Sequence, residues 1–160
     1  MKQYIGTKLI EAVPALRYSD GTKTMVVEMG RDKTAEEADF ISRAEMCDMG
    51  YRVRYPDGYE SWSPQDVFEE AYRPTDGMNF GLAIEAARKG NRIARKGWNG
   101  KGQYVQLASG ISYKTSDGNT VNVEHEAIGN QALAFVGTSG VQMGWLASQA
   151  DMLADDWEIV

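Results

Sequence analysis

The segment that most constrains the fold is residues 78–98, MNFGLAIEAARKGNRIARKGW. Asn79 suits a helix N-cap, because its side-chain oxygen can accept a hydrogen bond from a free amide of the first turn. Apolar residues then recur at helical spacing, at Phe80, Ala83, Ile84 and Ala87. Gly90 follows at a position where helices commonly end in a left-handed residue. The segment therefore predicts a helix over residues 79–89 and a strand over residues 91–96.

Trp98 comes directly after this strand, in the glycine-rich turn GWNGKG. A large ring in a loop with exposed backbone around it suits stacking on a flat ligand. Trp145 is also preceded by a glycine. A place in the core is the alternative for every tryptophan, and the apolar C-terminal neighbours of Trp157 favour the core for that one.

Composition is that of a globular protein of one ordinary or two small domains. The 160 residues are 42% hydrophobic and 25% charged, with a net charge of −6. The negative charge argues against general binding to nucleic-acid polymers, which requires many cationic side chains. Cys47 is the only cysteine, so an intrachain disulfide is excluded and a reducing compartment is expected. We see neither a signal peptide nor an apolar run of membrane-spanning length, so we expect a cytoplasmic protein without a membrane partner.

The first half reads as alternating strands and helices. Residues 3–12 are predicted to form a strand that Pro14 ends, because proline cannot donate to a ladder. Residues 23–28 predict the next strand. Thr34 with Glu37 three residues later predicts a capping box, opening a helical segment that Gly50 closes.

A hairpin and a second helix are predicted next. Strands over residues 51–55 and 59–62 flank the turn Pro-Asp-Gly, and Ser63 is expected to cap a helix with Pro64 at its first position. The run GYRVRYPDGYESWSPQDVFEEAYR, together with MKQYIGTKLIEA at the start, resembles a small α+β module at the N-terminus of uncharacterised bacteriophage proteins. We therefore expect residues 1–74 to form a small α+β domain of unknown role, followed by a polar hinge over residues 75–77.

The second half reads mainly as strands. They are expected over residues 103–107, 111–115, 120–124, 131–136, 141–145 and 157–160. Ser148 is expected to cap a short helix with Asp151 at its third position. The predicted fold class is α+β in two small domains, the second (residues 78–160) being an antiparallel sheet curled around a helix with a short C-terminal helix.

Signatures of catalysis are missing from the sequence. His125 is the only histidine, so neither a histidine metal cluster nor a histidine acid–base pair can be built. Cys47 has no histidine near it in sequence, and GWNGKGQ lacks the spacing of a phosphate-binding P-loop. We therefore predict no catalytic residue, no metal and no cofactor.

Charged residues gather in two segments of the second half. The basic one is either a site for a small polyanion or a solvated helix end and strand, and contains Arg88, Lys89, Arg92, Arg95, Lys96 and Lys101. Asp155 and Asp156 follow the last predicted helix, where its dipole disfavours negative charge. Their partner is expected to be a ribose hydroxyl pair, an adenine amino group, or Arg92 and Arg95.

Three motifs carry a second resemblance: MNFGLAIEAARKG, RIARKGWNGKG and the C-terminal GWLASQADMLADDWEIV. They resemble the second Thoeris anti-defence family of bacteriophages, whose members bind a cyclic ADP-ribose isomer made by host TIR-domain enzymes and do not cleave it. The resemblance covers residues 78–160. This sequence departs from the shorter members by carrying residues 1–77, and it matches weakly over residues 112–140.

The resemblance implies a homotetramer in the host cytoplasm, with ligand sites between protomers. It implies that Trp98 and Trp145 stack on the ligand and that a set of polar residues contacts it: Asn99, Ser148, Gln149, Asp151 and Asp156. Phe80 and Arg92 complete the expected site. The resemblance also implies that some relatives hold cyclic dinucleotides at separate sites. One sequestering protein then inhibits both Thoeris and CBASS defence.

Two other functions remain open from the sequence. One is an enzyme that degrades the same cyclic nucleotides, for which Asp151 and Asp156 are the candidate carboxylates. The other is a phage protein-interaction module without a nucleotide ligand.

Overall fold

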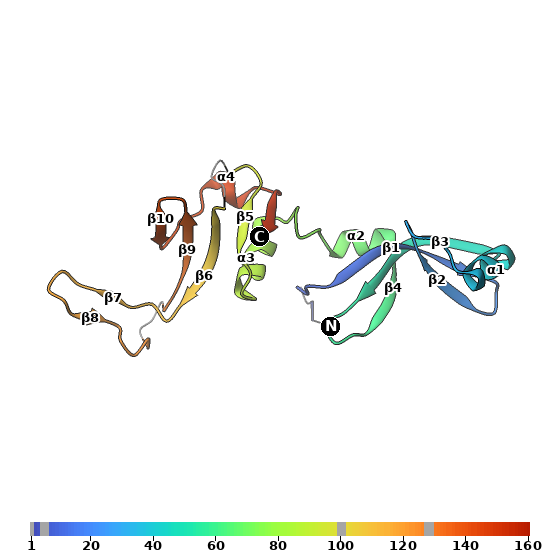
Figure 1. Cartoon of the computed structure of the whole chain (residues 1–160), viewed down its shortest axis with the longest axis horizontal. Helices are drawn as coiled ribbons and strands as arrows, with labels where there is room; N and C mark the ends of the chain where they lie inside the picture. Colours follow the sequence, from blue (N-terminus) through green and yellow to red (C-terminus); the bar gives the residue numbers. More distant parts are fainter. Residues whose placement is uncertain (1, 4–6, 99–101, 127–129) are drawn as a thin grey trace. The chain divides into compact units, whose positions relative to one another are not determined.

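A computed structural model describes residues 2–3, 7–98, 102–126 and 130–160. The chain divides into two compact units, Met1–Arg73 and Pro74–Val160. Each unit combines helices with antiparallel strands (Figure 1), so the α+β class predicted from the sequence is confirmed.

The first unit is a four-stranded antiparallel sheet in the order β2-β1-β3-β4. Its elements are β1 (Glu11–Ser19), β2 (Thr24–Glu28), α1 (Ala35–Arg43), β3 (Met46–Arg54), β4 (Glu60–Pro64) and α2 (Gln65–Ala71). The predicted capping box opens α1. The Glu37 amide donates to Thr34 Oγ1 at 3.1 Å, and the Thr34 amide donates to Glu37 Oε2 at 2.8 Å.

The first strand predicted over residues 3–12 is wrong for residues 7–10, because β1 begins at Glu11 and runs through Pro14; residues 4–6 lie outside the described residues. The Pro14 carbonyl accepts from the Met29 amide on the β2 side, at the end of the β1–β2 pairing. The backbone nitrogen and the carbonyl of one residue in an antiparallel strand point to the same side. The nitrogen of Pro14, which carries no hydrogen, therefore also faces the β2 side. The ladder between β1 and β3 therefore loses no hydrogen bond.

Two other predictions in this unit were also wrong. Residues 46–50 belong to β3 rather than to the helix, and Gly50 lies opposite Ala15 within the sheet. Ser63 pairs with Tyr51 in β4, so α2 begins after Pro64 without a side-chain cap. In each case a pairing with a distant strand outweighs the local capping pattern.

The second unit contains a five-stranded antiparallel sheet in the order β10-β9-β6-β5-β11 and a two-stranded arm, β7-β8 (Figure 1). Its helices are α3 (Phe80–Arg88) and α4 (Gln149–Met152). Its strands are β5 (Ile93–Arg95), β6 (Tyr104–Ser109), β7 (Tyr113–Lys114), β8 (Thr120–Val121), β9 (Gln131–Gly137), β10 (Gly140–Met143) and β11 (Trp157–Ile159).

The segment that precedes α3 is tied to the C-terminal strand. Met78 and Trp157 exchange backbone hydrogen bonds of 2.8 and 3.1 Å, and the Ile159 amide donates to the Thr75 carbonyl at 2.9 Å. Two residues therefore anchor the predicted polar hinge over residues 75–77 to β11: Thr75, its first residue, and Met78, which follows it. These bonds cover the outer edge of β11.

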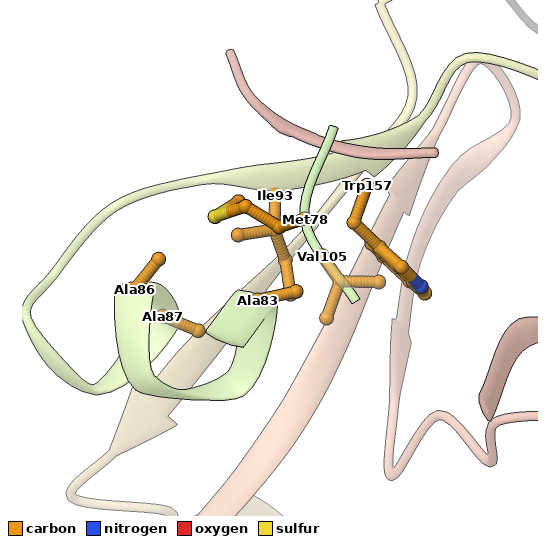
Figure 2. Packing of buried hydrophobic residues seen from close by; sticks show 7 residues of the cluster. All are labelled: Met78, Ala83, Ala86, Ala87, Ile93, Val105 and Trp157. Carbon is orange, nitrogen blue, oxygen red and sulfur yellow. The ribbon is translucent and has the colours of Figure 1, made fainter. Parts of the chain in front are cut away.

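The core of the second unit forms where α3 lies on the sheet. Alanines of the helix face one buried residue from each of three strands, and Met78, which precedes the helix, joins them. Figure 2 shows the cluster: Met78, Ala83, Ala86, Ala87, Ile93, Val105 and Trp157. Asn79 caps α3, accepting from the Leu82 amide at 2.9 Å, and Gly90 follows the helix with φ +91°, both as predicted. Trp157 is fully buried, which confirms the core position expected for it. No helix in the described ranges is long and apolar enough to span a membrane.

Candidate functional site

Four aromatic rings meet at one end of this core. Trp98 is half-buried and packs edge-on against Phe135 and Trp157, with ring centroids 5.4 Å away in each case, and against Trp145 at 6.0 Å. Trp145 is also half-buried, and its centroid lies 6.2 Å from that of Trp157. Trp98 and Trp145, the two expected stacking residues, are thus neighbours that share Trp157 as their support.

Phe80 joins this aromatic cluster from the first position of α3. Its ring lies 5.5 Å from that of Trp157 and is half-buried. The structure therefore brings together Phe80, Trp98 and Trp145, which stand far apart in the sequence.

Arg95 lies beside the cluster and holds two carboxylates. Its Nε donates to Asp156 Oδ1 at 2.7 Å, and its Nη1 donates to Asp151 Oδ1 at 3.1 Å. The hydrogen bond from Arg95 is the largest cause of a lowered pKa for Asp156. Of the partners considered for Asp156, the fold thus supplies Arg95. Asp155 is exposed and, within the described part of the chain, forms no ion pair.

Asp151 is held from its other side by the start of α4. Its Oδ2 accepts from the Ser148 amide at 3.0 Å and from Ser148 Oγ at 2.7 Å, which completes the predicted capping box. Burial raises the pKa of Asp151, but the hydrogen bonds from Ser148 and Arg95 outweigh it, so the net shift of the pKa is downward. Gln149 is the exposed first residue of α4.

A surface pocket of about 360 Å³ opens along β5, β6 and β11. Its wall includes Arg92, Lys96, Trp98, Gln103, Tyr104 and Glu158. Arg92 lies over the Tyr104 ring, with its Cζ 4.6 Å from the ring centroid. The wall is therefore rich in cationic and aromatic side chains, a combination that suits an anionic ligand with a flat base.

The expected site residues that the structure describes lie in different places around Trp98. Arg92 and Trp98 line the pocket, Phe80 and Trp145 belong to the aromatic cluster, and Ser148, Asp151 and Asp156 belong to the Arg95 network. Gln149 is exposed on α4 and belongs to none of these sets. Asn99 lies outside the described residues. The sequence did not identify Tyr104, Gln103 or Glu158 as site residues, because their place depends on which strands pair and which face each strand presents.

Other chemistry-bearing groups stand apart from this site. His125 is exposed in the loop after β8, and Cys47 is exposed in β3 of the first unit. Among residues the structure describes, no group of three or more His, Cys, Asp and Glu side chains is placed to hold a metal ion.

Comparison with known proteins identifies this part of the chain. The family model for the Thoeris anti-defense 2-like domain matches residues 78–160. Thoeris anti-defense 2 of Bacillus phage SP01 is 34% identical over 86 residues, which is 52% of this chain and 94% of that relative. The match spans α3, the Trp98 turn, the Arg95 network and β11. The chain therefore belongs to the Thoeris anti-defense 2-like family.

Proposed function

We propose that this is a bacteriophage anti-defence protein that binds glyco-cyclic ADP-ribose made by host TIR enzymes and sequesters it without cleavage. The observation that carries the proposal is the position of Trp98. One residue both lines the 360 Å³ pocket and packs against Trp145 and Trp157. Stacking of a base on such a ring contributes about 1–3 kcal/mol.

Sequestration requires only tight binding in the host cytoplasm. If the free signal is micromolar, a site with nanomolar affinity supplies a thousandfold margin, about 4 kcal/mol of binding free energy. No bond in the ligand needs to break.

The state of the two carboxylates favours binding over catalysis. A degrading enzyme would use Asp151 or Asp156 as a general base, yet both accept hydrogen bonds from Arg95 and both have a lowered pKa. A carboxylate with a lowered pKa is a weak proton acceptor. Both groups suit a role in shaping the site.

We further propose that the protein is a homotetramer with ligand sites between protomers. Residues 141–153 present several exposed apolar side chains, among them Leu146 at 88% and Leu153 at 77% exposure. A large apolar side chain that is this exposed is a candidate for burial in an interface between copies of the chain. Light scattering on the purified chain should give about four times the 17.7 kDa chain mass, and Leu146→Glu should lower it. A wild-type monomer would contradict this arrangement.

A thermal-shift panel tests the ligand class. It compares cyclic ADP-ribose isomers with cyclic dinucleotides, the second ligand class that we propose for the protein. A ligand at 100 times its dissociation constant should stabilise the protein by about 2.7 kcal/mol. The absence of any shift across the panel would favour a protein-interaction module instead.

The same panel on a shorter chain examines residues 1–74, which we propose form a separate module that is not needed for binding. That chain should begin at Pro74, because the Thr75 carbonyl accepts from β11. Equal shifts in both chains are expected. Loss of the shift in the shorter chain would assign the first unit a part in binding.

A further inference from the structure

Among the residues that the structure describes, three cations line the pocket beside Trp98, and two of them have a carboxylate partner. Arg95 is engaged with Asp151 and Asp156. Lys96 Nζ lies 3.6 Å from Asp76 Oδ2. Arg92 is exposed and, among the described residues, has no carboxylate within ion-pair distance, although Glu158 lines the same pocket.

The fold fixes Arg92 and Tyr104 on one face of the sheet. Ile93 pairs with Val105, which places Tyr104 opposite Ala94, and Arg92 is two residues from Ala94 on the same side. The backbone of each residue is also anchored. The Arg92 carbonyl accepts from the Val160 amide at 3.0 Å, and Tyr104 pairs with Val136 of β9.

The contact between these side chains orders the guanidinium. Its Cζ lies 4.6 Å from the centre of the Tyr104 ring, within the range of a cation–π interaction. A guanidinium that rests on an aromatic face keeps its N–H groups available at its rim, which suits bidentate binding to phosphate oxygens.

We infer that Arg92 is the diphosphate-binding residue of this pocket and that Tyr104 is a positioning residue that holds it in place. The inference rests on the proposed function for the identity of the natural ligand. The chemistry it assigns to the pocket, recognition of a diphosphate group, can be tested without that ligand.

The test uses inorganic pyrophosphate as the probe and the full chain labelled with nitrogen-15. The indole N–H resonance of Trp98, which lines the same pocket, reports binding in every variant. Arg92→Gln should weaken binding about tenfold or more, because it removes a charge-assisted bidentate contact. Tyr104→Leu, which removes the aromatic face, should weaken it about two- to fivefold. Tyr104→Phe keeps that face and should bind like the wild type.

Arg88→Gln is the matched control, since Arg88 is an exposed cation of α3 that does not line the pocket. It should leave the affinity unchanged. A wild type that does not respond to pyrophosphate would overturn the inference. Equal weakening by Arg88→Gln and Arg92→Gln would also overturn it, because binding would then follow net charge.

Equal affinities for Tyr104→Leu and Tyr104→Phe would refute the positioning role while leaving Arg92 as the contact. A different binding result would show that the proposed function is wrong. In that case pyrophosphate still binds through Arg92, but glyco-cyclic ADP-ribose does not bind to the wild type.

Discussion

Arg95 Nε donates to Asp156 Oδ1 at 2.7 Å, across 61 positions of the chain. The bond joins the end of β5 to the residue just before β11, and the Asp156 carbonyl accepts in turn from the Lys96 amide at 3.1 Å. The same guanidinium reaches the Ala150 carbonyl at 3.2 Å. Arg95 thus connects α4 and the start of the C-terminal strand to β5.

Asp156→Asn should make the second unit less stable above pH 4 by roughly 1 kcal/mol, a modest amount because the pair is partly exposed. Arg95 lowers the pKa of Asp156 in the folded state from its ordinary value of 3.8. The stabilisation is therefore fully present above pH 3.8 and is lost as the pH falls through the folded pKa. Urea unfolding of wild type and variant at several pH values measures it.

Asp155→Asn is the control for that experiment, because Asp155 is the exposed neighbour without an ion pair in the described structure. It should leave the unfolding free energy unchanged. The difference in unfolding free energy between the wild type and Asp156→Asn should become smaller in acid. A difference that stays the same would contradict the assignment of the stabilisation to the ionised carboxylate.

Trp98→Ala should lower both stability and ligand affinity. Although Trp98 follows the last strand residue in a turn, its ring packs edge-on against three rings. We expect about 2 kcal/mol of destabilisation from these contacts and about 1–3 kcal/mol of lost binding. Melting temperature and affinity are to be measured on the same sample. Unchanged affinity in a folded variant would place the site elsewhere.

Trp157→Ala provides the comparison with a core residue. Trp157 is fully buried, so its truncation should cost about 3–5 kcal/mol and unfold much of the second unit. A smaller loss of stability than that of Trp98→Ala would reverse the roles assigned to these two tryptophans.

Gly50→Ala should destabilise the first unit by about 3 kcal/mol or more. A Cβ on Gly50 would lie 2.1 Å from the Ser63 carbonyl oxygen and 2.6 Å from the Trp62 ring, which requires the backbone of β4 to move. Gly77→Ala is the control, because a Cβ there would have no atom within 4 Å. Chemical denaturation followed by backbone NMR separates the two units. A Gly50→Ala protein as stable as the control would show that the packing of Trp62 over Gly50 is wrong.

Glu37→Gln should remove an acid-sensitive contribution to α1. Hydrogen bonds from Arg31 and from the Thr34 amide lower the pKa of Glu37 from 4.5 to about 2. The wild-type stabilisation is thus complete above pH 4.5 and is lost as the pH falls towards 2. Glutamine can still accept from the Thr34 amide but forms no ion pair with Arg31.

Hydrogen exchange of the Ala38 amide, which donates to the Thr34 carbonyl at 2.9 Å, reports this local stability. After correction for intrinsic exchange, protection should fall in acid for the wild type and stay nearly level for Glu37→Gln. The same pH dependence in both proteins would argue against the ion pair.

The elements that the sequence predicted well are those set by local chemistry. Thr34, Asn79 and Ser148 each cap a helix as expected, because an N-cap needs only a residue of the right type next to the first turn. The errors at Pro14, Gly50 and Ser63 arose where pairing with a distant strand decides the conformation.

In the candidate site, too, the residues set by local sequence were predicted and those placed by strand pairing were not. Glycine-flanked Trp98 and Trp145 stand out in the sequence because of their neighbours. The partner of Asp156 stayed open among a ribose hydroxyl pair, an adenine amino group, or Arg92 and Arg95, because strand order decides which group reaches it. Tyr104 was missed because its meeting with Arg92 depends on the register of β5 and β6.

The most direct test of sequestration is recovery of the ligand after binding. The protein is incubated with glyco-cyclic ADP-ribose until none remains free, then denatured, and the released small molecule is analysed by mass spectrometry and chromatography. We predict that intact glyco-cyclic ADP-ribose returns in an amount equal to what was bound. A hydrolysed or rearranged product would contradict sequestration and identify the protein as an enzyme.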